Sequence, residues 1–269
     1  MIIAKIIGGL GNQLFQYATG LAVAQHTKTI LRLDLTNFAT YEHHTYSLKH
    51  FTITAPEATT LERLLYKQFH YYKEKSFRYD DSVWNRGSRV YLDGYWQSER
   101  YFIDIRPILK KEFSLKEPLS KGGTEIAAAI RKEVTPVCMH VRHGDFANNP
   151  SIAKYHGTTP LEYHYEAAKI VRARVPNAHF FVFSDSPEWV QENLRLPYPV
   201  TFIGQGADKN YEDIALMSLC RHFILSNSSF GWWGAWLSDA VDKIVIAPKK
   251  WTNTKLDITD LIPQSWIRI

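Results

Sequence analysis

Three short polar motifs in the sequence carry residue types that could bind a phosphate-containing ligand. They are His-Val-Arg-His-Gly-Asp at 140–145, Phe-Ser-Asp-Ser-Pro at 183–187 and Ser-Asn-Ser-Ser-Phe-Gly-Trp-Trp at 226–233. Each motif directly follows an apolar run that is typical of a buried strand. Loops at the carboxyl ends of strands in an open α/β sheet meet at one crevice. The motifs therefore predict a single site rich in anion donors and oxygen acceptors, which is typical of a nucleotide pocket.

Arg142 is the candidate for the strongest contact with a diphosphate. Its planar guanidinium donates paired hydrogen bonds and keeps its positive charge, so it could neutralise charge on a leaving phosphate. The alternative is a structural ion pair with Asp145 or with another carboxylate. The sequence leaves both roles open.

Asp185 and the serine-rich motif each have a binding role and a structural alternative. The Asp185 carboxylate could accept the N1–H and the exocyclic amine of guanine, or it could cap the helix that follows. The hydroxyl and backbone N–H groups of 226–229 would form an anion site at a helix N-terminus, whereas an N-cap needs only one of these residues. Aromatic residues at helical spacing favour a core position, so we predict that Trp232, Trp233 and Trp236 are core side chains rather than a sugar platform.

Alternating strand and helix patterns place these motifs in one doubly wound domain. Short, mostly apolar runs predict strands at 136–141, 178–183, 200–203, 222–225 and 243–247. Between them, apolar residues recur at helical spacing from Leu161 to Val175 and from Tyr211 to Leu219. This alternation predicts a parallel sheet with right-handed crossovers.

The N-terminal half of the chain begins with the same pattern. The run at 2–7 predicts a strand, Gly8-Gly-Leu-Gly11 predicts a tight turn, and a helix is expected to open near Asn12. We expect further strands at 29–33 and 89–93, a helix at 101–113, and short helices and loops within 34–88.

The length of the chain and one turn-rich segment indicate two lobes. At 269 residues the chain exceeds the ~100–200 residues typical of one domain. The Pro, Ser and Gly residues of 114–123 are typical of a connection. We therefore predict an N-terminal lobe of residues 1–118 and a C-terminal lobe of residues 119–269.

Composition restricts the class of partner. The net charge of +5 comes from scattered basic residues, which suits an acidic small molecule or a membrane surface better than nucleic acid. The two cysteines, Cys138 and Cys220, lie in apolar surroundings that favour buried thiols over a disulfide or metal pair. No continuous span of ~20 apolar residues occurs, so we expect a soluble protein of a reducing compartment.

Several motifs in register resemble those of the α-1,2-fucosyltransferases of bacterial type, glycosyltransferase family 11. Besides the three polar motifs, the resemblance rests on Gly-Gly-Leu-Gly-Asn-Gln-Leu-Phe-Gln-Tyr-Ala at 8–18 and Tyr-x-x-Gly-Tyr-Trp-Gln-Ser at 91–98, and it runs in order across nearly the whole chain. The family pattern has two adjacent arginines followed by Gly-Asp-Tyr. This chain departs from it, with His143 at the second arginine and Phe146 at the tyrosine.

The resemblance implies an inverting, metal-independent enzyme that transfers L-fucose from GDP-fucose to the 2-hydroxyl of a terminal galactose in an oligosaccharide or glycolipid. It implies an α/β fold with two Rossmann-like lobes facing across a cleft, of the GT-B type. The C-terminal lobe would bind the donor nucleotide and the N-terminal lobe would lie on the acceptor side. No resident metal or cofactor is expected, and the chain contains no Asp-x-Asp motif.

The resemblance also suggests site residues. The donor-binding set comprises Arg142, His143, Ser184, Asp185, Ser186, Asn227, Ser228, Ser229 and Phe230, with Gly11, Asn12 and Gln13 from the other lobe. Arg142 and His140 are catalytic candidates. The acceptor proton could pass to Asp145, His156 or Glu162, or a dissociative displacement could proceed without a strong base, so this role stays open.

Other classes of function explain fewer of these features. A nucleotide-sugar-binding homologue with weak or no transferase activity, or a fucosyltransferase of different linkage, remains an alternative. A dinucleotide oxidoreductase would need Gly-x-Gly-x-x-Gly, which Gly8-Gly-Leu-Gly11 does not match. A carbohydrate-binding module would explain the eight tryptophans but not the polar motifs. We expect a cytoplasmic enzyme of lipopolysaccharide or capsule biosynthesis, with peripheral association at the inner face of a bacterial membrane as a further option.

Overall fold

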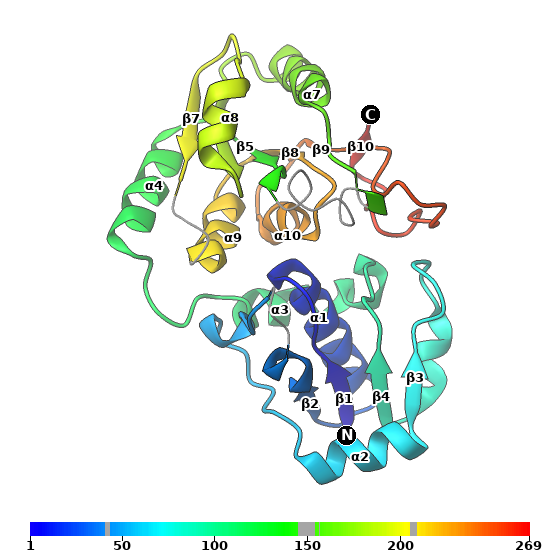
Figure 1. The fold of residues 1–269 in the computed structure, drawn as a ribbon. Helices are drawn as coiled ribbons and strands as arrows, with labels where there is room; N and C mark the ends of the chain where they lie inside the picture. Colours follow the sequence, from blue (N-terminus) through cyan, green and yellow to red (C-terminus); the bar gives the residue numbers. More distant parts are fainter. Residues whose placement is uncertain (41–43, 145–153, 156, 205–208) are drawn as a thin grey trace. The chain divides into compact units, whose positions relative to one another are not determined.

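The computed structural model describes residues 1–40, 44–144, 154–155, 157–204 and 209–269 (Figure 1). The chain forms two compact units. Unit 1 consists of Met1–Glu117 and Leu256–Pro263, and unit 2 consists of Pro118–Lys255 and Gln264–Ile269. The prediction of one continuous lobe over 119–269 is therefore wrong for 256–263, which packs with the N-terminal part of the chain.

Unit 1 is built on a four-stranded parallel sheet in the order β2-β1-β4-β3. The strands are β1 (Ile2–Lys5), β2 (Leu31–Asp34), β3 (Tyr71–Lys73) and β4 (Val90–Asp93), and the helices are α1 (Leu10–His26), α2 (Thr60–Phe69) and α3 (Arg106–Glu112). The three predicted strands of this half are confirmed with shifted ends. Strand β3 was not predicted. It is an edge strand of three residues, of which only the middle one is buried, and so short a strand has no distinct sequence pattern.

One helix of unit 1 is shorter than expected, and another is buried on nearly all sides. The predicted helix at 101–113 is only α3, because two 3-10 turns occupy Glu99–Tyr101 and Ile103–Ile105 before a proline starts α3. Helix α1 is buried at every residue from Leu10 to Ala24 except Asn12. A helix covered on nearly all sides holds its N-terminus rigidly at the carboxyl end of β1.

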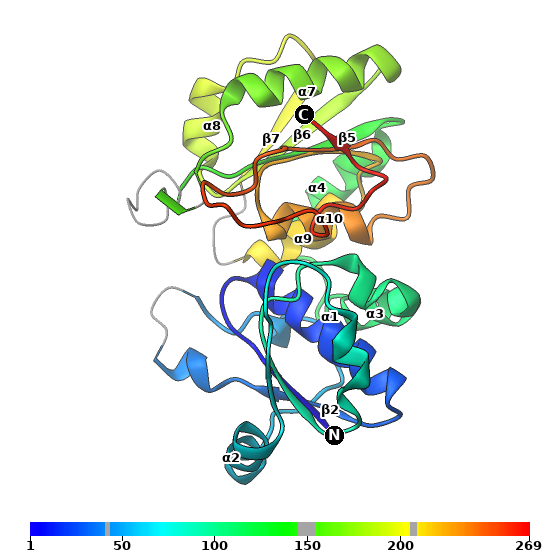
Figure 2. The ribbon, with the colours of Figure 1, turned by 90° about the vertical axis from the view of Figure 1, so that its right-hand side faces the viewer.

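Unit 2 contains a six-stranded parallel sheet in the order β10-β9-β8-β5-β6-β7. Its strands are β5 (Pro136–Val141), β6 (His179–Ser184), β7 (Val200–Ile203), β8 (His222–Leu225), β9 (Val245–Ala247) and β10 (Ile267–Arg268). Its helices are α4 (Lys121–Lys132), α7 (Leu161–Arg174), α8 (Pro187–Asn193), α9 (Asn210–Ser218) and α10 (Ser229–Leu237). Helices α7 and α8 lie on one side of the sheet and α4, α9 and α10 on the other (Figure 2). The predicted doubly wound architecture is confirmed.

The core of unit 2 contains the tryptophans and cysteines that the sequence assigned to it. Trp232, Trp233 and Trp236 are buried, and the rings of Trp232 and Trp236 stack with centroids 6.0 Å apart. Cys138 and Cys220 are buried free thiols, as predicted. Across the described ranges of the chain, no helix has the length and apolar character needed to cross a membrane.

Candidate functional site

The three polar motifs begin at the carboxyl ends of adjacent strands of unit 2. Strand β5 lies between β8 and β6, and the register pairs His140 with Leu225 and Val141 with Ser184. The three strands therefore end at the same edge of the sheet. This confirms the predicted convergence for the described part of each motif.

Arg142 and Asp185 form an ion pair at this edge. Nε of Arg142 lies 3.3 Å from Oδ2 of Asp185, and the side chains are 23% and 21% exposed. The other carboxylate oxygen accepts a hydrogen bond of 2.9 Å from the backbone N–H of His143. Burial by itself would raise the pKa of Asp185, but the charge of Arg142 and the backbone donors outweigh it and lower the pKa. The carboxylate is therefore ionised and holds Arg142 in one orientation.

Asp185 connects the first two motifs instead of capping a helix. Ser186, not Asp185, is the N-cap residue of α8, and no side chain caps that helix. A Cβ added to Gly144 would lie 2.9 Å from Oδ2 of Asp185, so a glycine is needed for this close approach. The helix-cap alternative for Asp185 is wrong, whereas its contact with guanine stays a prediction.

A buried polar cluster holds the backbone at Arg142. The hydroxyl of Ser226 donates to the carbonyl of His140 at 2.9 Å and accepts from the backbone N–H of Arg142 at 3.1 Å. Nε2 of His164, from α7, lies 3.2 Å from the Ser226 hydroxyl, and both side chains are 0% exposed. Side chains of β8 and α7 thus hold the point where the first motif leaves β5. His164 was not singled out from the sequence, because nothing in the sequence distinguishes it from the other residues of a predicted amphipathic helix.

His140 has the position of a packing residue. Its ring is 3% exposed and lies against Phe230, with ring centroids 5.8 Å apart. A Cβ on Gly231 would lie 2.8 Å from the ring, so this glycine admits the histidine. Burial and the charge of Arg142 hold the pKa of His140 well below its usual range, so the ring is neutral at pH 7. Burial and neutrality favour a packing role over the predicted catalytic role.

Helix α10 starts at the carboxyl end of β8 and is capped by its own motif. Ser228 is the N-cap residue, and its hydroxyl accepts a hydrogen bond of 3.3 Å from the backbone N–H of Phe230. The side-chain amide of Asn227, 4% exposed, donates to the carbonyls of Gly157 at 3.2 Å and Trp251 at 3.0 Å. Asn227 therefore holds loops in this structure, which argues against its predicted donor contact. The dipole of α10 still favours an anion at this edge.

The remaining predicted residues of unit 2 lie near the same edge. The ring of His143 stacks on Trp189 of α8, with centroids 3.5 Å and planes 10° apart. The Ser184 hydroxyl accepts a hydrogen bond of 3.0 Å from the backbone N–H of Ser186. The residue that replaces the second family arginine therefore contacts a tryptophan. Donor contacts of His143, Ser184, Ser186 and Ser229 stay predictions.

Gln13 is committed to the turn that starts α1. Its side chain is 0% exposed. Nε2 donates to the carbonyls of Gly8 and Thr45, both at 2.8 Å, and Oε1 accepts from the backbone N–H of Ser47 at 2.9 Å. Gln13 is therefore held by the backbone of unit 1 in this structure, and its donor contact stays a prediction.

The neighbours of Gln13 have different surroundings. Asn12 is the one residue between Leu10 and Ala24 that is not buried, and its Oδ1 accepts a hydrogen bond of 2.7 Å from Gln97. Gly11 is buried in the first turn of α1. Gln97 belongs to the motif at 91–98 and was given no role from sequence.

Of the three candidates for an acceptor base, the structure describes only Glu162. Asp145 and His156 lie outside the described residues, and Glu162 lies in the first turn of α7. Within the parts of the chain that the structure describes, no group of three or more His, Cys, Asp or Glu side chains is placed to hold a metal ion.

Sequence comparison relates this chain to enzymes that transfer sugars. The sequence model of glycosyl transferase family 11 matches residues 1–269. An Escherichia coli protein named alpha-1,2-colitosyltransferase is 30% identical over 291 residues, which cover 100% of this chain and 99% of that protein. Galactoside alpha-(1,2)-fucosyltransferase 2 of Pongo pygmaeus is 29% identical over 252 residues, which cover 90% of this chain and 70% of that protein.

Solved structures share the fold. FUT1 of Arabidopsis thaliana in complex with GDP superposes with a TM-score of 0.53 at 11% identity, covering 94% of this chain and 71% of that chain. The α-1,6-fucosyltransferase NodZ, soaked with GDP-fucose, gives a TM-score of 0.50 at 16% identity, covering 88% of this chain and 92% of that chain. The predicted α/β fold of the GT-B type is confirmed.

Proposed function

Because the chain belongs to glycosyl transferase family 11 and is a glycosyltransferase, we propose that it transfers L-fucose from GDP-fucose to the 2-hydroxyl of a terminal galactose. The relatives named for an α-1,2 linkage match by sequence over most or all of the chain, which supports this linkage. The α-1,6 enzyme NodZ, at 16% identity, is related by fold alone.

One observation supports the donor site above the others. Arg142 is paired with the ionised Asp185 at the strand edge from which all three polar motifs emerge. A guanidinium held by one carboxylate keeps its planar donors oriented for a second anion. The N-terminus of α10, at the end of the neighbouring strand, adds a favourable dipole. We propose that the diphosphate of the donor binds here.

The proposed reaction is a direct displacement. The acceptor hydroxyl forms a bond to the anomeric carbon while the bond from that carbon to the β-phosphate oxygen breaks, which inverts the configuration. Negative charge grows on the leaving GDP, and the Arg142 guanidinium and the α10 dipole stabilise it. The hydroxyl proton passes to a base or to solvent, with Asp145, His156 and Glu162 as the candidate bases.

The units take different substrates in this proposal. Unit 2 binds the donor and unit 1 the acceptor, and no resident metal or cofactor takes part. A third relative, the Escherichia coli O-antigen biosynthesis glycosyltransferase WbnK, is 27% identical over 302 residues, which cover 97% of this chain and 98% of that protein. Its name supports an acceptor that belongs to a bacterial surface glycan. We further propose that the enzyme is cytoplasmic and acts at the inner face of the membrane.

A colitose donor is the second candidate. The specific observation is the full-length match to a protein named alpha-1,2-colitosyltransferase. Purified protein should be assayed with GDP-fucose and with GDP-colitose, using lactose as the acceptor, and the product linkage read by NMR. An α-1,2-fucosylated product supports the main proposal. A colitosylated product alone supports the second, and binding of GDP without turnover on a panel of galactosides supports a nucleotide-sugar-binding homologue.

Activity is expected to persist in excess EDTA. Protein donors at the strand edge, Arg142 and the α10 N-terminus, would stabilise the leaving GDP in place of a metal ion. Initial rates should be measured with EDTA and after adding back Mn²⁺ or Mg²⁺. Loss of turnover in EDTA that either metal restores would contradict this mechanism.

Asp185→Asn is expected to weaken binding of GDP and ADP alike, by about 1–3 kcal/mol, because loss of the ion pair releases Arg142. Isothermal titration calorimetry with both nucleotides measures the effect. The matched control is Asp242→Asn, an exposed position of the same unit. Weaker binding of GDP with unchanged binding of ADP would instead reveal the guanine contact predicted from the sequence.

A further inference from the structure

Unit 1 contains a pocket that none of the proposed donor contacts uses. It has a volume of about 280 Å³ and is lined by Ile7, by residues 73–77 and 93–95, and by Leu256. Ile7 follows β1, and the two longer stretches include the ends of β3 and β4. The pocket therefore lies at the carboxyl edge of the unit 1 sheet, where open α/β sheets bind ligands.

We propose that this pocket binds the terminal galactose of the acceptor. The inference rests on the proposed function and assigns one part of it to named residues. It also gives a role to the Tyr-x-x-Gly-Tyr-Trp-Gln-Ser motif at 91–98, which forms one wall of the pocket.

Two aromatic rings supply the apolar wall that a pyranose needs. Phe77 and Tyr95 both line the pocket, and their rings are 6.0 Å apart between centroids with planes 20° apart. Both side chains are partly exposed. The C–H groups on one face of a galactose ring form an apolar surface, which packs against aromatic rings, while the hydroxyl groups point elsewhere.

Two carboxylates in fixed positions supply acceptors for those hydroxyl groups. Glu74 accepts hydrogen bonds from the backbone N–H groups of Tyr95 at 2.6 Å and Trp96 at 2.9 Å. Asp93 accepts from Nζ of Lys5 at 3.0 Å and from the hydroxyl of Tyr71 at 2.7 Å. Both contacts of Asp93 use Oδ2, so Oδ1 of Asp93 and each oxygen of Glu74 keep a lone pair for a sugar hydroxyl. Burial raises the pKa of Glu74 to about 7, so near neutral pH this group can also donate as a carboxylic acid.

The backbone of the motif is shaped around Glu74. A Cβ added to Gly94 would lie 2.3 Å from Cβ of Glu74, so only glycine fits beside the carboxylate. Trp96 has a φ of 56°, a left-handed conformation that a non-glycine residue adopts at a cost, and Glu74 holds it through its backbone N–H. The next residue, Gln97, donates to Asn12 at 2.7 Å. The loop is thus held at both ends and presents a preformed wall.

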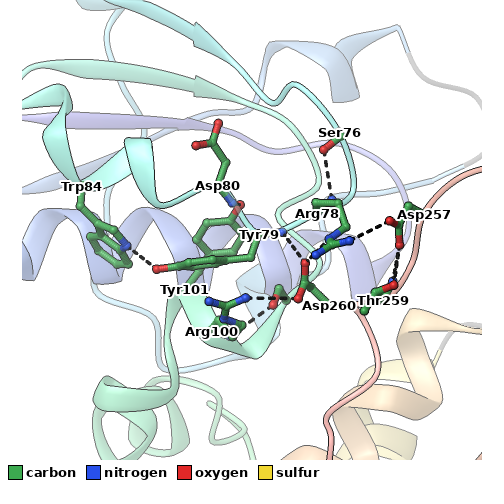
Figure 3. Close-up of polar contacts among 11 residues, drawn as sticks. Ser76, Arg78, Tyr79, Asp80, Trp84, Arg100, Tyr101, Asp257, Thr259 and Asp260 are labelled. Carbon is green, nitrogen blue, oxygen red and sulfur yellow. Dashed lines mark hydrogen bonds and ion pairs between the residues drawn. The ribbon is translucent and has the colours of Figure 1, made fainter.

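Another part of the pocket lining comes from the segment 256–263, which follows unit 2 in the sequence and belongs to unit 1. Leu256 begins this segment, and the next residues are held by arginines of unit 1 (Figure 3). Arg78 contacts Asp257 at 2.8 Å and Asp260 at 2.7 Å, and Arg100 contacts Asp260 at 3.2 Å. Asp260 is 11% exposed, whereas its partners Arg78 and Arg100 are 50% and 57% exposed, so this is a surface network centred on one shielded carboxylate. The network keeps Leu256 against the pocket.

Two variants test the pocket by opposite changes. Phe77→Ala removes the aromatic wall, and Ser76→Trp fills the pocket from an exposed position that lines it. Each is expected to raise the KM for lactose about fivefold to tenfold, the size of one lost aromatic contact, and to leave the Kd for GDP unchanged. Saturation-transfer NMR of lactose without donor should show a matching loss of signal. The control is Phe69→Ala, an exposed aromatic of α2 that does not line the pocket.

The outcomes separate this inference from the proposed function. If wild-type protein fucosylates lactose while both variants keep its KM and NMR signal, the pocket assignment is overturned and the function stands. If wild-type protein transfers fucose to no galactoside, the function fails, and the NMR experiment still decides whether the pocket binds lactose. If Phe77→Ala does not fold, Ser76→Trp decides by the same two measurements.

Discussion

Arg142→Ala is expected to lower kcat by about 10²-fold or more, by analogy with removal of an oxyanion donor. The guanidinium is held by Asp185 at the strand edge where the diphosphate is proposed to bind. Charge on the β-phosphate grows as the glycosidic bond breaks, so the interaction is stronger in the transition state than in the ground state. Its loss must therefore appear in kcat, and not in KM alone.

Two further variants separate the role of the Arg142 guanidinium from that of charge in general. Arg142→Lys should restore only part of kcat, because an ammonium group cannot donate the paired hydrogen bonds of the fork. Arg174→Ala, at an exposed position at the end of α7, should leave kcat unchanged. Circular dichroism and thermal melting of all variants should stay near wild type.

Two results would contradict this role. A folded Arg142→Ala protein with normal kcat and a raised KM for the donor would show that Arg142 binds the ground state only. A protein that fails to fold would show that the ion pair with Asp185 is chiefly structural.

Acidification from pH 7 to pH 4 is expected to destabilise unit 2 by about 3 kcal/mol through His164 alone. Burial lowers the pKa of His164 to about 4, although the carbonyls of Pro160 and His140 oppose the shift. Burial, with the charge of Arg142, also lowers the pKa of His140. In the unfolded chain both pKa values return to about 6.5. The stability is therefore present above pH 6.5 and is lost as the pH falls toward the folded pKa values.

Urea unfolding followed by tryptophan fluorescence at pH 7.0, 6.0, 5.0 and 4.0 measures this loss. His164→Asn removes one of the two titrating groups. The free energy of unfolding of this variant should therefore fall less steeply than that of wild type as the pH is lowered below 6.5. The same slope in wild type and variant would assign the acid sensitivity to other groups.

The sequence by itself determined the secondary structure that carries the donor motifs. Strands at 136–141, 200–203 and 222–225 match the structure residue for residue. The strands at 136–141 and 222–225 are buried along their whole length, so each must be a mostly apolar run. The order of strands and helices then required a parallel sheet, and a parallel sheet places the ends of its strands at one edge. The tryptophans of α10 were likewise predictable as core from their spacing and bulk.

Only the tertiary structure decided which of the predicted side chains in each unit are occupied by contacts within the protein. Gln13 and Asn227 have the residue types of ligand-binding groups, but contacts with loops distant in sequence occupy both. Asp185 proved to be the partner of Arg142, and His164 proved to support the strand end from another helix. The segment 256–263 packs in unit 1 with Leu261 and Ile262 buried and with ion pairs to Arg78 and Arg100, more than 150 residues earlier in the chain. Local patterns determine elements, whereas the partner of a polar group is set by distances that exist only after the chain has folded.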